Sequence, residues 1–373
     1  MAARKVPNTL KNLRIAQLAP PFESVPPAGY GGTERVVSTL TEELVRRGHD
    51  VTLFASGDSQ TSARLVPIVE QALWHHNPPC NDFAVHQAQI FGAILDQIGE
   101  FDVVHSHLDF YGFPLAHTSV NPMVSTLHGR LDVPSLVETY RAFASLPLVS
   151  ISDSQRRPLA AANWVATIQH GIDLDAFSFN PAPGSYLAFL GRISPEKGLD
   201  IAIRVARQAG WPLLVAARPP LSFARSPEAQ RDREYFEQVV QPLLSEPGVE
   251  LIGEVGGVEK AAFLGNAAAL LFPIRWQEPF GLVMPEALAC GTPVIALREG
   301  SVPEVIEDGV TGFIRHFEDE LVRAIERLPE LSRAACRAAA ERRFSPAAMA
   351  NAYEQVYLNM WEGTAAPELA VYA

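Results

Sequence analysis

Short apolar runs alternate along the first half of the chain with stretches in which apolar residues recur every three or four positions. The runs predict buried strands, and the stretches predict helices with one apolar face. Strand signals fall within residues 13–18, 51–56, 102–109, 123–127, 148–154 and 165–173. Six strands interleaved with helices indicate a parallel sheet of the doubly wound α/β kind.

The helix expected at residues 34–47 illustrates the pattern, because its apolar side chains share one face. They are Val36, Val37, Leu40 and Leu44. Thr33 is placed to cap the start of this helix, and Gly48 ends it. By contrast, residues 56–82 show no regular pattern, so we expect a long functional loop there.

A second series of strand and helix signals follows residues 172–186, which are rich in proline and turn-forming residues. We therefore expect two Rossmann-like domains, residues 1–175 and residues 176–344. The C-terminal segment 345–373 predicts a helix that packs back on the first domain. This helix carries an apolar stripe of Tyr353, Val356, Tyr357, Met360 and Trp361.

Length and composition agree with two globular domains. The chain has 373 residues, of which 47% are hydrophobic and 19% charged. No run approaches the roughly 18 apolar residues of a membrane helix, and the N-terminus lacks the apolar core of a signal peptide. Cys80, Cys290 and Cys336 show no metal-binding spacing, which fits reduced thiols. We therefore expect a cytoplasmic protein without evident membrane association.

The formal net charge of −12 argues against nucleic acid as a partner. It argues equally against docking to a membrane by charge alone. The sequence contains no signal for an oligomeric state.

Residues 268–297 hold the strongest candidate chemistry. An apolar strand is followed by a loop with Glu278, which Pro279 keeps out of helical geometry. A short helix then starts near Met284, has Glu286 in its first turn and stops at Gly291. The two carboxylates do not share a helix face, so we expect them to have different roles. The amides of residues 280–284 form a helix N-terminus, which attracts an anion such as phosphate.

Other candidate residues follow strands elsewhere in the chain. Gly31-Gly32 follows the first strand, and His128 stands at the end of the strand 123–127. Arg192 leaves a strand five residues before Lys197, and two cations near a helix N-terminus suit a departing diphosphate. The alternatives are an ordinary glycine turn, a loop-capping histidine and a solvated pair of surface charges.

Several site types are poorly supported by the sequence. The glycine-rich segment is GYGGTE and does not match G-x-G-x-x-G, and the motif G-x-x-x-x-G-K-[ST] does not occur. His105 and His107 share one strand face but have no third ligand nearby, which is a weak metal signal. We therefore expect no metal and no cofactor, and an anion neutralised by protein groups.

Four segments together resemble the motifs of the retaining glycosyltransferases of family 4. They are GGTERVV, STLHG, FLGRISPEKG and EPFGLVMPEALACGTPVIA. The resemblance spans roughly residues 13–361. It implies the GT-B fold, in which two Rossmann-like domains face each other across a cleft. It also implies metal-independent transfer of a sugar from a nucleotide diphosphate sugar, with the anomeric configuration kept.

The resemblance assigns roles to the candidate residues by motif match. Arg192 and Lys197 would bind the pyrophosphate, Glu278 the sugar hydroxyls and Glu286 the ribose. The remaining contacts would come from the backbone of Phe280, Gly281 and Leu282, from Gly31 and Gly32 at the phosphate, and from His128 near the reacting carbon. His170 stands where many members carry another residue, so it receives no role.

The donor is expected to be uridine diphosphate glucose or a similar sugar nucleotide, and the acceptor a small molecule or glycan. The acceptor should contact residues 20–30 and 56–82 of the first, acceptor-binding domain, while the second domain binds the donor. Two alternatives stay open at this point. One is an epimerase or hydrolase on the same fold, and the other is a non-catalytic nucleotide-sugar binding protein.

Overall fold

The computed structural model describes residues 12–29, 31–76, 83–119, 121–220, 226–245 and 247–365, with backbone alone at 83, 84 and 363–365. The chain forms two compact units. Unit 1 contains Met1–Gly171 and Pro346–Ala373, and unit 2 contains Ile172–Ser345. The sequence expectation placed the corresponding divisions after residues 175 and 344.

Unit 1 is built on a seven-stranded sheet in the order β3-β2-β1-β4-β5-β6-β7, and every neighbouring pair is parallel. Its strands are β1 (Arg14–Leu18), β2 (Asp50–Ser56), β3 (Arg64–Val69), β4 (Val103–Ser106), β5 (Met123–Thr126), β6 (Leu148–Ser150) and β7 (Trp164–Thr167). The doubly wound sheet is confirmed, but its strand number was underestimated because β3 was missed.

The expectation that residues 56–82 are irregular was wrong for β3. This strand lies at the sheet edge and is exposed or half-buried along its length, so it lacks a continuous apolar run. It also contains Pro67, which an edge strand tolerates because one side of its backbone has no ladder partner. The part of this segment from residue 77 to residue 82 lies outside the described residues.

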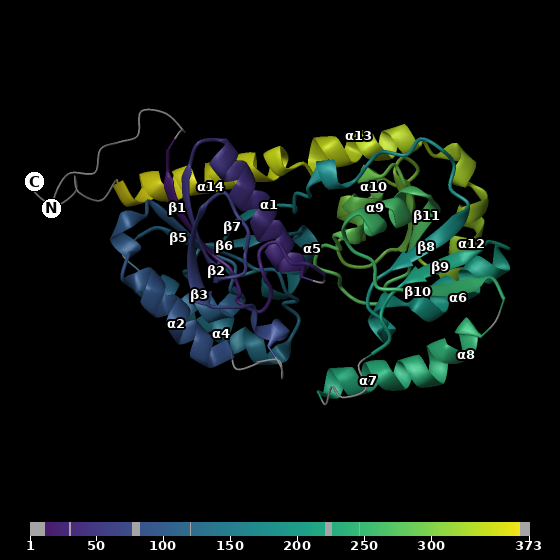
Figure 1. Cartoon of the computed structure of the whole chain (residues 1–373), viewed down its shortest axis with the longest axis horizontal. Helices are drawn as coiled ribbons and strands as arrows, with labels where there is room; N and C mark the ends of the chain where they lie inside the picture. The colour runs from purple at the N-terminus through teal and green to yellow at the C-terminus, as the bar shows by residue number, and fades with distance from the viewer. Residues whose placement is uncertain are drawn as a thin grey trace, which may run out of the picture. The chain divides into compact units, whose positions relative to one another are not determined.

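Helices cover both faces of the unit 1 sheet. They are α1 (Gly32–Arg46), α2 (Phe83–Leu95), α3 (Phe113–Thr118), α4 (Val137–Ala142), α5 (Asp153–Arg156) and α14 (Pro346–Ala365). Successive strand residues point to opposite faces. Leu18 of β1 therefore joins the apolar cluster of α2, whereas Gln17 contacts Tyr357 of α14. Helix α1 packs beside α14 (Figure 1).

Unit 2 repeats this plan with a six-stranded parallel sheet in the order β10-β9-β8-β11-β12-β13. Its strands are β8 (Tyr186–Leu190), β9 (Leu213–Ala216), β10 (Val249–Gly253), β11 (Ala267–Phe272), β12 (Val294–Leu297) and β13 (Gly312–Arg315). In each sheet the strand order reverses beside the first strand, between β1 and β4 and between β8 and β11. Ligands bind at the carboxyl ends of strands next to such a switch point.

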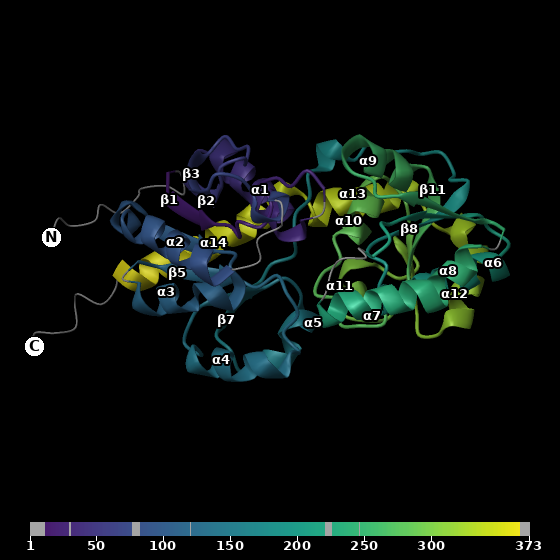
Figure 2. The same cartoon turned by 60° about the horizontal axis from the view of Figure 1, so that its bottom comes forward.

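The helices of unit 2 form two layers around its sheet (Figure 2). Helices α6 (Leu199–Gln208), α7 (Pro227–Tyr235), α8 (Gln241–Leu244) and α12 (Glu318–Glu326) lie on one side. On the other lie α9 (Gly257–Gly265), α10 (Val283–Ala289) and α13 (Arg333–Arg343), and a further short helix is α11 (Val302–Val305). The sequence interpretation had no helix at α13.

Short helical turns complete the chain. The 3₁₀ turns are Leu73–His75, Ile98–Glu100, Asp109–Gly112, Pro134–Leu136, Arg157–Leu159, Leu174–Ala176, Pro195–Lys197 and Leu328–Glu330, and a π-helical turn spans Phe236–Val240. One expected cap was wrong. Helix α1 begins at Gly32 with Gly31 as its N-cap residue, so Thr33 lies inside the first turn and caps nothing.

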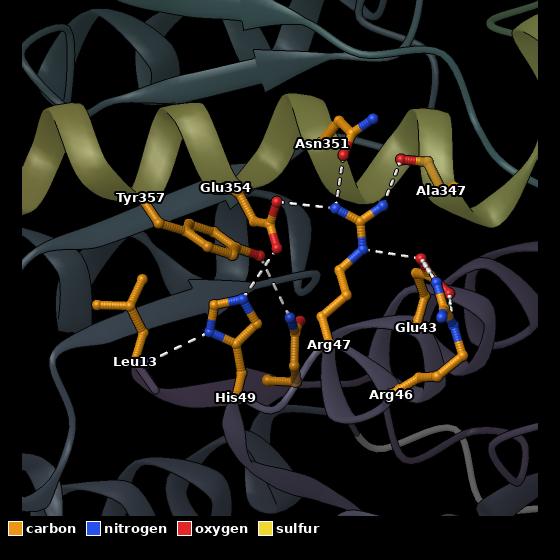
Figure 3. Close-up of polar contacts among 10 residues, drawn as sticks. Leu13, Glu43, Arg46, Arg47, His49, Ala347, Asn351, Glu354 and Tyr357 are labelled. Atoms are coloured by element: carbon orange, nitrogen blue, oxygen red, sulfur yellow. Dashed lines mark hydrogen bonds and ion pairs between the residues drawn. The ribbon is translucent and has the colours of Figure 1, made fainter. Parts of the chain in front are cut away.

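Helix α14 is held to unit 1 by its apolar stripe and by a polar cluster (Figure 3). In the stripe, Tyr353, Val356, Tyr357 and Trp361 are buried. In the polar cluster, the Arg47 guanidinium donates to Glu354 (2.8 Å), to Asn351 (2.5 Å) and to the carbonyl of Ala347 (2.8 Å). His49 Nε2 lies 3.0 Å from Glu354 Oε1, and Arg47 also pairs with Glu43 of α1. The expected packing of this helix on the first domain is therefore observed within unit 1.

Replacing Arg47 should loosen this helix. The Arg47 side chain is 17% exposed, and Arg47→Ala removes its bonds to both carboxylates, so we expect a loss of about 2 kcal/mol of stability. Thermal unfolding measures the loss. The neighbouring variant Arg46→Ala is the control, because Arg46 is 68% exposed and pairs only with Glu43 among the described ion pairs. Equal melting temperatures for the two variants would contradict this account of how α14 is held.

Candidate functional site

Two loops of unit 2 meet through one ion pair. Lys197 follows β8, and Glu278 follows β11, the neighbouring strand across the switch point. The Lys197 ammonium group donates to Glu278 Oε2, and the Trp276 indole N–H donates to the same oxygen at 2.8 Å. The Lys197 Nζ also lies 5.1 Å from the centre of the Trp276 ring. Both residues were candidate site residues in the sequence analysis, and the structure brings their side chains into contact.

The loop with Lys197 is packed tightly against the end of β11. Gly198 has a left-handed backbone (φ 72°), and a Cβ atom there would lie 2.1 Å from the carbonyl oxygen of Pro273. Only glycine fits such an approach without a backbone shift. The Arg275 amide also donates to the carbonyl of Glu196 at 2.8 Å. Backbone contacts of this kind fix the position from which Lys197 reaches Glu278.

A third loop, which follows β12, holds the Glu278 loop through hydrogen bonds to its backbone. The Ser301 amide donates to the carbonyl of Glu278 at 3.0 Å, and the Ser301 hydroxyl donates to the carbonyl of Phe280 at 2.7 Å. A Cβ atom on Gly300 would lie 2.3 Å from the amide nitrogen of Glu278. Gly281 is less confined, because the nearest atom to its Cβ would be the terminal methyl carbon of Met284, at 2.9 Å. Both glycines have positive φ angles, so this sharp turn depends on them.

Glu286 lies in the first turn of α10, as the sequence predicted, and is 4% exposed. Its Oε1 lies 2.5 Å from the Nζ atom of Lys260 in α9. Leu282 is the N-cap residue of the same helix, and residues 281–283 are half-buried. The carboxylate that was expected to bind a neutral hydroxyl is thus already neutralised by a lysine that sequence reasoning missed.

Arg192 occupies a separate acidic environment. Its guanidinium lies 2.6 Å from Glu196 and 3.6 Å from Asp232, and its side chain is 52% exposed. Arg192 and Lys197 therefore belong to one loop, but each has its own carboxylate partners in the structure. The predicted role of Arg192 at a pyrophosphate is untested by these contacts.

In unit 1, the glycine pair marks the start of α1. Gly31 is buried beside Pro27, whereas Gly32 is exposed. A Cβ on Gly31 would lie 2.7 Å from Pro27 and 3.2 Å from a carboxylate oxygen of Glu34. Glu34 is itself buried, and burial raises its pKa to about 7. This carboxyl group had no role in the sequence interpretation.

His128 lies in a cluster of histidines after the central strands of unit 1. Its Nε2 is 2.9 Å from Nδ1 of His107, and its ring stacks on that of His170 with 5.2 Å between centroids. The His128 amide donates to Asp109 Oδ1 at 2.8 Å, which fixes the turn at the end of β5. Burial lowers the pKa of His128 to about 3, so the ring is neutral at pH 7.

The two segments expected to contact an acceptor are joined in the structure. The amides of Leu73 and Trp74 donate to the carbonyls of Pro21 and Phe22, each at 3.0 Å. The rings of Phe22 and Trp74 stack with 5.3 Å between centroids. Tyr30, at the end of the first segment, lies outside the described residues. Residues 20–29 and 71–76 therefore lie together beyond the carboxyl ends of β1 and β3, while residues 64–69 belong to the sheet as β3.

Some chemistry is not represented among the described residues. No group of three or more histidine, cysteine, aspartate or glutamate side chains in them is arranged to hold a metal ion. Likewise, no helix in the described part of the chain is long and apolar enough to cross a membrane. Cys290 and Cys336 are buried free thiols, and Cys80 lies outside the described residues.

The residues that sequence reasoning missed fall into two groups. Lys260 and Asp109 contact candidate residues from distant parts of the chain, and no local pattern marks them. Gly300 and Ser301 carried a weak turn signal in the sequence. They are a glycine and a capping-type residue that begin three residues after the end of β12. That signal predicted a turn, but not which loop the turn would support.

Comparison with known proteins gives two family matches that together span residues 30–343. Residues 30–176 match the family described as Glycosyltransferase Family 4, and residues 174–343 match Glycosyl transferases group 1. The chain is 26% identical over 377 residues to a D-inositol 3-phosphate glycosyltransferase of Mycolicibacterium smegmatis. That alignment covers 83% of this chain and 82% of the relative.

Two solved structures extend the comparison to the fold. The crystal structure of AviGT4, a glycosyltransferase involved in Avilamycin A biosynthesis, matches with a TM-score of 0.73 and 26% identity, covering 94% of this chain and 98% of that one. The structure of Anabaena HepE in complex with UDP and glucose matches with a TM-score of 0.70 and 18% identity, covering 93% and 100%. The second likeness concerns the fold alone.

The packing of Gly198 can be tested against a matched glycine. Gly210 has nearly the same backbone angle (φ 70°), but no atom lies within 4 Å of a Cβ placed there. Gly210→Ala should therefore cost about 1 kcal/mol through backbone strain alone. Gly198→Ala should cost at least about twice as much, because the end of β11 must also move. Thermal unfolding compares the two, and equal losses would show that the loop of Lys197 is not fixed against Pro273.

Proposed function

The chain is a glycosyltransferase of the family 4 type, and from this premise we propose how its residues transfer a sugar. The proposed reaction moves a hexose from a nucleotide diphosphate sugar to an acceptor hydroxyl and keeps the anomeric configuration. It uses no metal ion. The proposed donor residues belong to unit 2, and His128 and the proposed acceptor segments belong to unit 1.

The contact between Lys197 and Glu278 is the observation that carries the proposal. In the absence of a donor the ammonium group and the carboxylate neutralise each other. A diphosphate at the switch point competes for the ammonium group, because the diphosphate of a sugar nucleotide carries about two negative charges and a carboxylate carries one. Glu278 is then free to accept hydrogen bonds from hydroxyls of the transferred sugar. Binding of the donor thus replaces the ion pair by two contacts, one from Lys197 to the diphosphate and one from Glu278 to the sugar hydroxyls.

The start of α10 suits the same diphosphate. Gly281 and Leu282 precede this helix, Val283 is its first residue, and all three are half-buried. Helix N-termini favour anions. Glu286 would repel a nearby phosphate if it were unpaired, but Lys260 neutralises it. A neutralised carboxylate can still accept hydrogen bonds, which supports the proposed role of Glu286 at the ribose hydroxyls. Arg192, whose own side chain is 52% exposed, is proposed to exchange its carboxylate partners for a phosphate oxygen.

Retention is proposed to occur by attack on the face from which the diphosphate departs. In this reaction the leaving phosphate oxygen takes the proton of the acceptor hydroxyl while the new glycosidic bond forms. The charge of the departing diphosphate increases as its bond to the sugar breaks. A cation that is already in place stabilises this charge more in the transition state than in the bound donor. Lys197 is proposed to be that cation.

The acceptor is proposed to be a small soluble molecule with a free hydroxyl, bound by residues 20–29 and 56–76. These segments contain the stacked rings of Phe22 and Trp74, and Trp74 is 42% exposed. Exposed aromatic rings at the end of a sheet suit the flat faces of sugars and other rings. The names of two relatives, a D-inositol 3-phosphate glycosyltransferase and an alpha-maltose-1-phosphate synthase, each contain a phosphorylated small molecule, which makes such compounds the first to test.

The proposed function is tested by incubating the purified chain with uridine diphosphate glucose and a panel of hydroxyl acceptors. The Anabaena structure that matches in fold is described as a complex with UDP and glucose, so uridine diphosphate glucose is the first donor to try. Mass spectrometry should show a glucosylated product that forms only when an acceptor is present. Its rate of formation should not change when a metal chelator is added. Free glucose without acceptor would indicate a hydrolase, an epimerised donor would indicate an epimerase, and binding without turnover would indicate a binding protein.

Removing the proposed cation should slow transfer. Lys197→Ala should lower turnover about a hundredfold, which corresponds to about 3 kcal/mol of transition-state stabilisation. Steady-state kinetics with the identified acceptor measures the effect. Arg323→Ala is the control, because Arg323 is an exposed cation of the same unit that pairs with Asp319 within α12. Turnover of Lys197→Ala within threefold of the unmodified chain would remove Lys197 from the diphosphate.

A further inference from the structure

Four histidines of unit 1 form one buried cluster, of which the proposed reaction uses only His128. The ring centroids of His105 and His107 are 4.0 Å apart, and those of His107 and His128 are 5.1 Å apart. His170 stacks on His128 from the other side. Burial lowers the pKa of each of these rings. The cluster is therefore neutral at pH 7.

Neutrality makes the hydrogen bonds of the cluster directional. A neutral imidazole has one nitrogen that donates and one that accepts. If one nitrogen of a ring must donate, the other must accept, and the neighbouring ring is constrained in turn. A chain of bonded neutral histidines therefore transmits the position of a proton from one end to the other.

In this cluster the direction is given by the Gln17 side chain on β1. Its amide N–H donates to the hydroxyl of Tyr357 at 3.3 Å, and its Oε1 lies 2.8 Å from Nε2 of His107. An amide oxygen can only accept, so His107 carries its proton on Nε2. The Nδ1 of His107 then accepts from Nε2 of His128 at 2.9 Å. His128 consequently has its proton on Nε2 and a lone pair on Nδ1.

The surroundings of His128 agree with this arrangement. Its Nδ1 is buried and has no hydrogen-bond partner among the described residues. An unpaired acceptor is tolerated in a protein interior better than an unpaired N–H donor. Asp109 fixes the backbone of His128 through its amide, and His170 covers one face of the ring.

Gln17 is itself held from the C-terminal helix. The Tyr357 hydroxyl on α14 lies 2.7 Å from Nδ1 of His105, and Nε2 of His105 lies 2.7 Å from the hydroxyl of Thr126. Gln17 and His105 are direct neighbours across β1 and β4. The amide of Gln17 thus lies in a fixed polar frame, although it is fully buried in the sheet face.

We propose that Gln17 and His107 are positioning residues that fix the proton of His128 on Nε2, so that Nδ1 accepts a hydrogen bond from a hydroxyl of the substrate. The substrate contact rests on the proposed function. The proton position does not, because it follows from contacts within unit 1. The inference makes His128 a hydrogen-bond acceptor rather than a charged group near the reacting carbon.

The proton position can be measured without any activity. Protein labelled with ¹⁵N-histidine reports, through long-range ¹H–¹⁵N correlations, which nitrogen of each ring carries hydrogen. The His128 signals are identified by their loss in His128→Gln. We expect one neutral form at pH 7, with the proton on Nε2. A proton on Nδ1, or on both nitrogens, would overturn the proposal.

Two isosteric variants test the positioning role. Gln17→Met removes the amide but keeps the volume, so the signals of His128 should become those of a mixture, and turnover should fall about tenfold, the effect of one hydrogen bond. Tyr353→Phe is the control. It removes a hydroxyl that bonds Thr126 at 3.0 Å in the same cluster but leaves Gln17, His107 and His128 in place. It should change neither the signals nor turnover.

The outcomes separate the two proposals. An unchanged single form of His128 in Gln17→Met would remove Gln17 from the role, whatever the activity. If the unmodified chain shows the Nε2 proton but transfers no sugar, the positioning stands and the proposed function fails. On addition of uridine diphosphate glucose, the Nδ1 signal should shift as its lone pair accepts a hydrogen bond. If the donor binds and is turned over but the Nδ1 signal of His128 does not shift, the proposed contact between His128 and the substrate is wrong.

Discussion

The pairing of Lys197 with Glu278 is the interaction on which the candidate donor site depends. These residues are 81 positions apart in sequence, and they meet because β8 and β11 are neighbours in the sheet. Each loop is short and leaves its strand at the same edge. The pair therefore follows from the strand order, while its geometry follows from the backbone contacts of the two loops. If either residue were removed, the charge of the other would stay partly buried without a partner to neutralise it.

The glycines around this pair set how closely the loops approach. Gly198 faces the carbonyl of Pro273, and Gly300 faces the backbone of Glu278, at distances that exclude any side chain. Positive backbone angles at both positions add to the constraint. These residues give the site its precision at some cost in stability, because glycine is also the residue that loses the most freedom on folding. The approach of the two loops is thus fixed by backbone packing, and the side-chain pair forms on loops that are already in place.

Sequence reasoning predicted the fold well because strands and helices each have a characteristic local pattern of apolar residues. Buried parallel strands are continuous apolar runs, and helices carry apolar stripes, so twelve of the strands could be recognised one at a time. The edge strand β3 escaped because Pro67 and its half-exposed residues break the apolar run. The loop position of Glu278 was predictable in the same local way, since Pro279 disfavours helical geometry at the residue before it. The helical position of Glu286 was predictable because it lies between the expected start of the helix near Met284 and its end at Gly291.

The contacts of the site were less predictable, because they join residues that no local rule connects. Lys260 reaches Glu286 from another helix, and Asp109 reaches the His128 turn from another strand end. The histidine cluster shows both cases. The alternation of His105 and His107 along a strand predicted that they share a face, but the connection to His128 requires that β4 and β5 be neighbours. The direction of the hydrogen bonds then depends on Gln17, far earlier in the chain.

The central claim is that the loops after β8 and β11 hold the diphosphate of the donor through Lys197. The most direct measurement is a crystal structure of the chain with bound uridine diphosphate. The account predicts a phosphate oxygen about 3 Å from Nζ of Lys197, with Glu278 released from the ammonium group. A well-ordered diphosphate bound away from these two loops, with the ion pair of Lys197 and Glu278 intact, would contradict it.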